Sequence, residues 1–191
     1  MLCVFAGSAP GVPPEDLDLA AAVGAALARA GVPIVYGGGS TGCMGAMADA
    51  ALAAGARVVG VVPRDLFRAD EVHAGVELVE VDSLHERKRV MLERAEAFVV
   101  LPGGLGTLDE AGEVLTWAQL GIHAAPIVVV DPTGYWRPLV DWVDRAVLRG
   151  YVSVAARDFL LVVPDAAGVL PAIRAFTAPV ATRGPLSLDQ T

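Results

Sequence analysis

The stretch Leu101-Pro-Gly-Gly-Leu-Gly-Thr-Leu-Asp-Glu110 follows the apolar residues 97–100 and precedes a helical pattern. It predicts a buried strand, a glycine-rich turn and a helix that begins at Thr107. Glycines let backbone N–H groups approach an anion closely, and the amino end of a helix adds a partial positive charge. The stretch is therefore typical of a phosphate-binding loop, with the carboxylate of Glu110 about one turn into the helix.

On both sides of this stretch, short β-branched runs alternate with alanine-rich helical patterns, which is typical of parallel strands joined by crossover helices. We expect strands at residues 2–6, 33–36, 57–62, 76–81, 98–101, 127–130 and 160–163. We expect helices near residues 14–30, 43–54, 84–95, 108–121, 135–149 and 166–176. The predicted fold is α/β: a Rossmann-like, doubly wound and mainly parallel sheet with helices on both faces.

The length of 191 residues, with 54% hydrophobic and 19% charged residues, is enough for one domain with a buried core. We expect this domain over residues 1–176 and an irregular tail over residues 177–191, where periodicity is lost. The apolar runs are far shorter than the about 20 residues of a membrane span, and the first residues lack the pattern of a signal peptide. These features predict a cytoplasmic protein with no membrane partner.

The net charge of −8 and the isoelectric point near 4.8 argue against a nucleic-acid partner, because such binding needs many clustered Lys and Arg residues. A small anion can still be bound locally, since Lys88, the only lysine, lies in the basic cluster His85-Glu-Arg-Lys-Arg89. Cys3 and Cys43 are in no cluster with histidine, and the histidines lack metal-ligand spacing. We expect neither a metal site nor a cofactor.

Three predicted strands end in glycine-rich turns, which contain Gly7-Ser8, Gly37-Gly-Gly39 and Gly103-Gly-Leu-Gly106. The carboxyl ends of parallel strands meet at one edge of a sheet, so the three turns open on the same side. Gly37, Gly39 and Gly42 match a dinucleotide-binding pattern, but they follow the second strand and the nearest acid, Asp65, is too far along the chain. Each turn alone is also explained by tight packing; the three together favour a phosphate site.

Helix geometry predicts which side of the helix each residue of the basic cluster faces. Ser83-Leu-His-Glu86 matches a capping box, so the helix is expected to begin at Leu84. Leu84, Met91 and Ala95 then form an inward stripe.

Arg87 and Lys88 fall on the same side of that helix as the inward stripe, whereas Arg89 points elsewhere. Charges there are costly unless they are paired or open into a cleft, which makes Arg87 and Lys88 candidate site residues. The alternative is a solvated run of charges whose stems cover apolar surface.

Glu110 has a similar alternative, because Thr107-Leu-Asp-Glu110 is also a capping-box pattern. In that interpretation Glu110 only satisfies the Thr107 N–H, and at the third helical position its carboxylate stays ionised at neutral pH. A site is favoured because the helix that carries Arg87 directly precedes the strand that leads to the glycine loop.

These motifs together resemble the Lonely Guy family of cytokinin-activating phosphoribohydrolases. The resemblance covers nearly the whole chain and rests on Phe5-Ala-Gly-Ser8, Val35-Tyr-Gly-Gly-Gly39, His85-Glu-Arg-Lys88, Pro102 to Glu110, and Thr116-Trp-Ala-Gln-Leu-Gly-Ile-His123. It implies hydrolysis of the N-glycosidic bond of N6-substituted adenosine 5′-monophosphates, which releases the base and ribose 5-phosphate. Several members also cleave AMP, as an AMP nucleosidase does. The resemblance further implies a homodimer.

The resemblance places the two catalytic positions at Arg87 and Glu110. Together with the glycine turns it gives a set of expected substrate-binding residues: Gly7, Ser8, Gly37, Gly38, Gly39, Glu71, Lys88, Gly103, Gly104, Leu105, Gly106, Thr107, Leu108, Asp109 and Thr116. Glu71 is placed on a spacing that is two residues shorter here than in the family. The chain departs from the family pattern at Ala9, Cys43, Asp109 and Ala125, and Ala9 is expected to weaken one phosphate contact.

The expected chemistry suits these residues. Cleavage builds positive charge on the ribose, which the Glu110 carboxylate can stabilise while it holds ribose hydroxyls or orients water. Arg87 can hydrogen-bond either the departing base or the phosphate.

Three other functions are open at this point. A pyridoxal-phosphate lysine decarboxylase would need Lys88 as its Schiff base, since the chain has no other lysine. A non-catalytic carrier of nucleotide or molybdenum cofactor would share the fold and the glycine turns. A nicotinamide-dependent oxidoreductase is disfavoured by the position of the glycine pattern.

Overall fold

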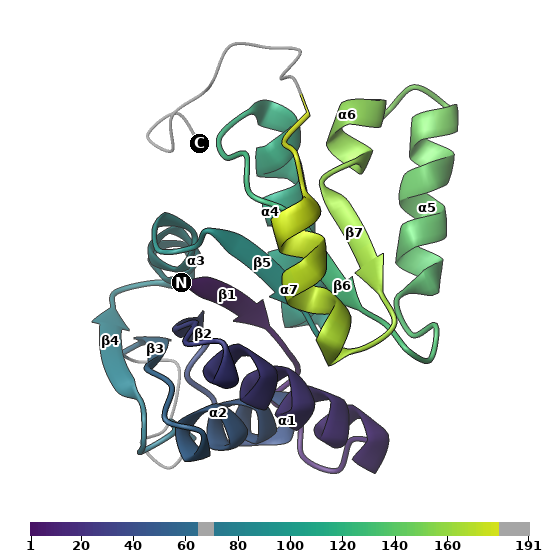
Figure 1. Ribbon diagram of the computed structural model, residues 1–191. Helices are drawn as coiled ribbons and strands as arrows, with labels where there is room; N and C mark the ends of the chain where they lie inside the picture. The colour runs from purple at the N-terminus through teal and green to yellow at the C-terminus, as the bar shows by residue number, and fades with distance from the viewer. Residues whose placement is uncertain (65–70, 180–191) are drawn as a thin grey trace.

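A seven-stranded parallel β-sheet forms the centre of the computed structural model, which describes residues 1–64 and 71–179 (Figure 1). Its strands are β1 (Leu2–Phe5), β2 (Ile34–Tyr36), β3 (Val58–Pro63), β4 (Glu77–Val81), β5 (Ala97–Val100), β6 (Ile127–Val130) and β7 (Leu160–Val163). The helices are α1 (Pro14–Arg29), α2 (Gly42–Ala53), α3 (Leu84–Glu93), α4 (Leu105–Leu120), α5 (Arg137–Leu148), α6 (Val154–Arg157) and α7 (Ala166–Ala175). The predicted α/β fold and its seven strands are confirmed.

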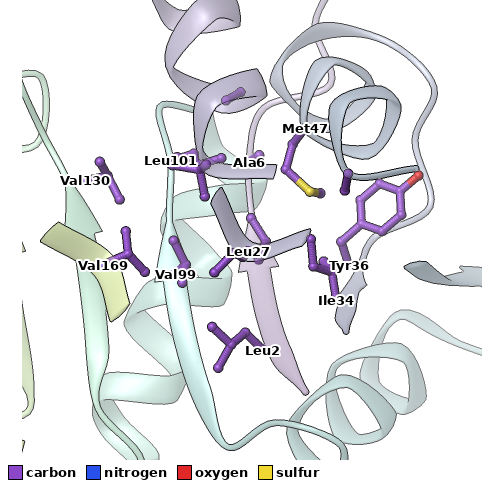
Figure 2. Close-up of a cluster of buried hydrophobic side chains, with 14 of the residues drawn as sticks. Leu2, Ala6, Leu27, Ile34, Tyr36, Met47, Val99, Leu101, Val130 and Val169 are labelled. Atoms are coloured by element: carbon purple, nitrogen blue, oxygen red, sulfur yellow. The ribbon is translucent and has the colours of Figure 1, made fainter. Parts of the chain in front are cut away.

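Helices cover both faces of the sheet, because the side chains of its apolar strands alternate between the two faces and both must be buried. On one face, α1, α2 and α7 contribute Leu27, Met47 and Val169 to a core with strand residues such as Ile34 and Val99 (Figure 2). On the other face, α3, α4 and α5 form a second core with the same strands. The sheet is thus the middle layer of three.

The strand order β4-β3-β2-β1-β5-β6-β7 reverses direction between β1 and β5. From β1 the chain builds outward to β4, then crosses back through α3 to place β5 beside β1, where Leu2 pairs with Ala97. The loop after β1 leads to α1 on one face and the loop after β5 leads to α4 on the other. Such a switch point opens a crevice at the carboxyl ends of the strands, which is where ligands bind in this class of fold.

The start of α4 differs from the prediction. The helix begins at Leu105, with Gly104 in an extended conformation as its N-cap, and not at Thr107. Leu105 lies between Gly104 and Gly106, and the glycines predicted a turn there. Leu105 is largely exposed, whereas Thr107 is buried in the first turn. Glu110 is therefore the sixth residue of α4 and is buried, and its proposed role as a helix cap for Thr107 is wrong.

The start of α3 at Leu84 is confirmed. Ser83 accepts a hydrogen bond from the N–H of Glu86 at 3.1 Å, and the Glu86 carboxylate accepts one from the Asp82 N–H at 2.7 Å, one residue earlier than a capping box requires. The predicted inward stripe is only partly correct. Met91 and Arg87 are buried, but Leu84 is 47% exposed.

The remaining differences are small. Sequence patterns missed α6, a single turn capped by Ser153, because four residues are too few to show a period. After α7, residues 177–179 are outside helices and strands; the other tail residues and Asp65 lie outside the described part of the chain. The extent of the domain and its tail stays a prediction. Among the described residues, no helix is both long and apolar enough to cross a membrane.

Candidate active site

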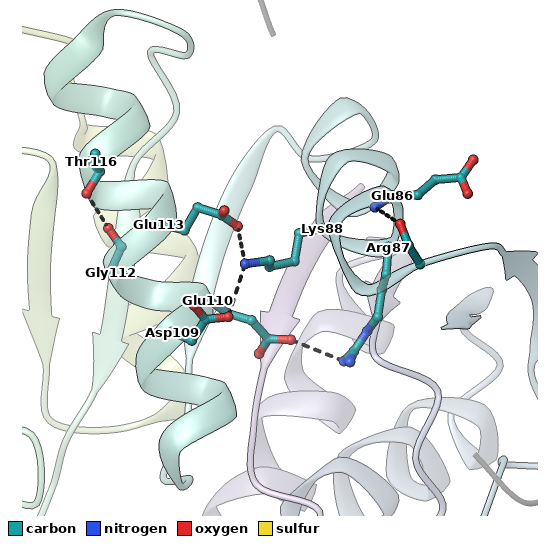
Figure 3. Close-up of polar contacts among 9 residues, drawn as sticks. Glu86, Arg87, Lys88, Asp109, Glu110, Gly112, Glu113 and Thr116 are labelled. Atoms are coloured by element: carbon teal, nitrogen blue, oxygen red, sulfur yellow. Dashed lines mark hydrogen bonds and ion pairs between the residues drawn. The ribbon is translucent and has the colours of Figure 1, made fainter. Parts of the chain in front are cut away.

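Arg87 and Glu110 meet at the switch point of the sheet. Arg87 extends from α3 and Glu110 from α4, and Arg87 Nη2 donates a hydrogen bond to Glu110 Oε1 at 3.1 Å (Figure 3). The residues are only 7% and 6% exposed. The prediction that the helix before β5 brings Arg87 to the glycine loop is therefore confirmed, and the solvated-charge alternative for Arg87 is wrong.

The burial of Glu110 changes its acidity. Burial raises the pKa of Glu110 to about 7, because the low-dielectric surroundings disfavour the carboxylate; Arg87 and Lys88 oppose this change, and Asp109 and Glu113 add to it. The expectation of a fully ionised carboxylate assumed an exposed position in the first turn, whereas Glu110 is buried. A carboxyl group with a pKa near neutrality can hold or release a proton at physiological pH.

A cavity of about 290 Å³ opens above the ion pair. Its lining residues come from the loops after β1 and β5, from α2, and from the ion pair: Ala6, Gly7, Ser8, Ala9, Met44, Arg87, Gly104, Gly106, Thr107 and Glu110. The N–H groups of the first turn of α4 have no partner inside the helix, whose first bond runs from Leu108 N to Gly104 O. The cavity therefore combines a helix amino end, which attracts anions, with a buried carboxyl group.

Two of the glycines are required by close packing. A Cβ at Gly37 would lie 2.0 Å from Arg87 Nη2, and a Cβ at Gly103 would lie 2.1 Å from Thr107 Oγ1. Neither Gly37 nor Gly103 lines the cavity. For these two positions the tight-packing interpretation describes what the structure shows: they let Arg87 and the first turn of α4 come close to the loops.

The third loop, Gly37–Gly39, packs against Arg87 but does not line the cavity. Gly38 has φ of +79°, and its carbonyl accepts a hydrogen bond from the His73 N–H at 2.9 Å. Glu71 lies nearby, where its backbone carbonyl accepts hydrogen bonds from Ser40 N and Oγ. Gly37, Gly38, Gly39 and Glu71 are all outside the cavity lining, so a direct substrate contact for them stays a prediction.

Lys88 lies between α3 and α4 instead of facing the cavity. Its Nζ is 3.1 Å from Asp109 Oδ2 and 3.0 Å from Glu113 Oε2, and its side chain is only 14% exposed (Figure 3). These two hydrogen-bonded carboxylates raise the pKa of Lys88, and burial opposes them. The structure thus places Lys88 and Asp109 in one ion-pair cluster on the flank of Glu110.

The other predicted positions on α4 lie on its outer side. Leu105 is exposed, and Leu108, Asp109 and Thr116 line a separate apolar groove of about 500 Å³ between α4 and α5. Thr116 donates its hydroxyl hydrogen to the Gly112 carbonyl at 2.8 Å. Within the described chain, these residues do not share the cavity of Glu110.

Sequence reasoning missed several residues at this edge. Ala6 and Met44 line the cavity, and Tyr135 and Trp136 hydrogen-bond the glycine loop from the β6–α5 connection. A usable signal was present: Gly134-Tyr-Trp136 follows a buried strand, so it lies at the same edge of the sheet as the glycine turns. Among the described residues, no group of three or more His, Cys, Asp or Glu side chains could hold a metal ion.

Comparison with known proteins agrees with the motifs. The protein-family model described as "Possible lysine decarboxylase" matches residues 44–173. The chain is 41% identical over 173 residues to the cytokinin riboside 5′-monophosphate phosphoribohydrolase of Rhodococcoides fascians, covering 90% of this chain and 87% of that protein. It is 44% identical over 166 residues to a probable enzyme of the same name from Oryza sativa subsp. japonica, covering 86% and 73% of the two chains. An Arabidopsis thaliana enzyme of that name is 40% identical, covering 86% and 78%.

Solved structures with the same architecture are more distant in sequence. The molybdenum cofactor binding protein of Rippkaea orientalis superposes with a TM-score of 0.70 at 18% identity, covering 91% of this chain and 95% of that chain. The molybdenum cofactor carrier protein of Chlamydomonas reinhardtii gives 0.69 at 20% identity, covering 91% and 94%. At these identities the likeness shows the fold alone.

Proposed function

Because the chain belongs to the Lonely Guy family of cytokinin riboside 5′-monophosphate phosphoribohydrolases, we propose that it hydrolyses the N-glycosidic bond of N6-substituted adenosine 5′-monophosphates. The products are the free base and ribose 5-phosphate. The observation that carries the proposal is the buried pair of Arg87 and Glu110 beneath a cavity lined by glycine loops. AMP, whose adenine carries no N6 substituent, is proposed as a further substrate.

We infer that the cavity binds the 5′-phosphate and the ribose of the substrate. The 5′-phosphate binds at the amino end of α4, where N–H groups of Gly106 and Thr107 lack helical partners and Gly104 leaves open space. Binding the phosphate there fixes the ribose above Glu110. Holding the substrate at a non-reacting group in this way supplies orientation, which is a large part of the rate acceleration by an enzyme.

Glu110 acts at the reacting carbon in this scheme. As the C1′–N9 bond breaks, its electron pair goes to the base and positive charge develops on the ribose, which the carboxylate stabilises. Water adds its oxygen to C1′ and gives one proton to Glu110, and the departing base takes one proton from solvent at a ring nitrogen, which balances the proton that Glu110 later returns to solvent. A pKa of about 7 lets Glu110 accept this proton and return it to solvent near neutral pH.

The first role of Arg87 is to keep Glu110 ionised. The Arg87 guanidinium, 3.1 Å away, favours the ionised form of a carboxyl group that burial would otherwise keep protonated. A guanidinium group carries several N–H donors, so Arg87 can also bind the phosphate or the departing base.

We further propose a homodimer. The groove between α4 and α5 is mainly apolar, and it is bordered by exposed aromatic side chains, Trp142 at 59% and Tyr151 at 77%. Exposed apolar surface of this kind is typical of subunit contacts. Analytical ultracentrifugation tests the proposal, and a monomer at micromolar concentration would contradict it.

Two other functions fit the site less well. A lysine decarboxylase would need a free Lys88 beside the cofactor, whereas Lys88 Nζ is held by Asp109 and Glu113 outside the cavity. A carrier of molybdenum cofactor has no need for a carboxyl group with a pKa near 7 under its ligand. Binding of a nucleotide without release of base would favour the carrier.

The test is product analysis after incubation with a panel of nucleoside 5′-monophosphates and the matching nucleosides. We expect base and ribose 5-phosphate from the N6-substituted adenosine 5′-monophosphates and no product from the nucleosides. Equal cleavage of nucleosides would contradict the proposed role of the cavity in phosphate binding. If no compound of the panel is cleaved, the proposed hydrolase activity is wrong.

A further inference from the structure

The connection between β6 and α5 contacts the loop after β5 through two side chains. The hydroxyl of Tyr135 donates a hydrogen bond to the Gly103 carbonyl at 2.6 Å, and the indole Nε1–H of Trp136 donates one to the Leu101 carbonyl at 3.2 Å. The partners are 32 and 35 residues apart in the chain. These contacts therefore tie together two separate loops at the edge of the sheet.

The carbonyl between these two is also held. The Pro102 carbonyl accepts a hydrogen bond from the Gly7 N–H at 3.0 Å, so three successive carbonyls of the loop have external donors. No cis peptide bond occurs among the described residues. In a trans peptide the carbonyl and the following N–H point in opposite directions. Directing the Gly103 carbonyl at Tyr135 thus turns the N–H of Gly104, a cavity residue, away from Tyr135.

Of the two donors, Trp136 is buried and Tyr135 is half exposed. The backbone N–H of Trp136 donates to Asp131 Oδ2 at 3.1 Å. The Tyr135 and Trp136 rings lie edge to face with centroids 5.1 Å apart. Neither side chain lines the cavity. They contact the backbone of the loop from outside the cavity.

We propose that Tyr135 and Trp136 are positioning residues, which hold the glycine loop after β5 in the conformation that binds the 5′-phosphate. The inference rests on the proposed phosphoribohydrolase function. Gly103 and Gly104 have wide backbone freedom, and freezing a loop before binding removes an entropic cost that the ligand would otherwise meet. The two aromatic residues supply that order and leave the chemistry to Arg87 and Glu110.

The test uses the full-length protein with the substitutions Tyr135→Phe and Trp136→Phe, which keep an aromatic ring and remove one donor. One lost hydrogen bond predicts a KM for AMP about three- to tenfold higher, with kcat changed by less than about twofold. The dissociation constant of ribose 5-phosphate, measured by calorimetry, should rise by the same factor, and the inhibition constant of adenine should not change. Tyr151→Phe, which keeps its ring in the groove between α4 and α5 and lies outside the cavity lining, is the matched control, with the oligomeric state of each variant checked by ultracentrifugation.

The outcomes separate the two proposals. If Tyr135→Phe binds ribose 5-phosphate as tightly as the unmodified protein does, the positioning role is wrong even though hydrolysis continues. If kcat falls and KM does not, the tyrosine acts on the chemical step and the inference is again wrong. If the unmodified protein binds ribose 5-phosphate but releases no base, the proposed function fails, while the calorimetric comparison still decides the role of Tyr135.

Discussion

Arg87 Nη2 lies 3.1 Å from Glu110 Oε1, although 23 positions separate the two residues in the chain. Removing two charges from water costs several kcal/mol, and a buried ion pair often contributes nothing net to stability. An apolar pair at this place would serve the fold equally well. The pair is therefore best explained by the site, where Arg87 keeps charge on a carboxyl group that burial tends to neutralise.

Substitution Glu110→Gln removes the carboxylate and keeps the size of the side chain. We expect kcat for base release from AMP or N6-substituted analogues to fall about 10²- to 10⁴-fold, as for the loss of a general base. The circular dichroism spectrum should match that of the unmodified protein. Full activity of this variant in the same assay would remove Glu110 from the mechanism.

The pKa of Glu110 also predicts two opposite pH dependences. The folded-state pKa of about 7 lies above the ordinary value of 4.5, so the folded state binds the proton more tightly than the unfolded state. The contribution of Glu110 to stability is fully present below about pH 4.5 and is lost as the pH rises through about 7. Activity changes in the other direction, because kcat/KM rises with ionisation of the carboxyl group and should show an acidic limb near pH 7.

Urea unfolding between pH 4.5 and 8 measures the first dependence, and initial rates over the same range measure the second. Glu110→Gln is the control for stability, since the unfolding free energy of this variant should lack the pH dependence that Glu110 contributes. An acidic limb at pH 4 to 5 would mean that the carboxyl group is solvated in the working enzyme.

Sequence patterns predicted the strands well because each strand of a covered parallel sheet is an apolar run, such as Ile127–Val130. They failed where a helix begins within a glycine-rich stretch, as at Gly104 and Leu105. That error matters at Glu110, since moving the helix start by two residues turns an exposed cap into a buried side chain. Burial on this scale depends on how α3 and α4 pack across the switch point, which no local pattern records.

The candidate pair itself was predictable in part. The stripe of Leu84, Met91 and Ala95 correctly predicts that Arg87 lies on the inward side of its helix, although Leu84 is exposed. Met91, one turn after Arg87, is the member of the stripe that is fully buried. The contacts of Lys88 with Asp109 and Glu113 join two helices and could not be predicted from either one.

Lys88→Met tests whether this lysine acts on the substrate or on Glu110. Lys88 lowers the pKa of Glu110, and its loss also leaves the charges of Asp109 and Glu113 uncompensated beside that carboxyl group. We therefore expect the acidic limb of kcat/KM to move to higher pH, with an unchanged dissociation constant for ribose 5-phosphate. Arg89→Met, on the exposed side of the same helix, should leave both quantities unchanged. Weaker ribose 5-phosphate binding with an unmoved limb would instead support the direct substrate contact that the family resemblance implies.

Gly37→Ala tests the closeness of Arg87 to the loop after β2. The added Cβ would lie 2.0 Å from Arg87 Nη2 and 3.0 Å from its Cζ, so the guanidinium must move away from its present place beside Glu110. Without that partner the pKa of Glu110 rises, and we expect a loss of kcat/KM at pH 7 that is partly recovered at higher pH. Gly112→Ala on α4 is the control: its Cβ meets nothing within 4 Å, and alanine in a helix is expected to stabilise the protein by about 0.5 to 1 kcal/mol. If Gly37→Ala loses activity equally at every pH, the glycine serves the loop itself and not the position of Arg87.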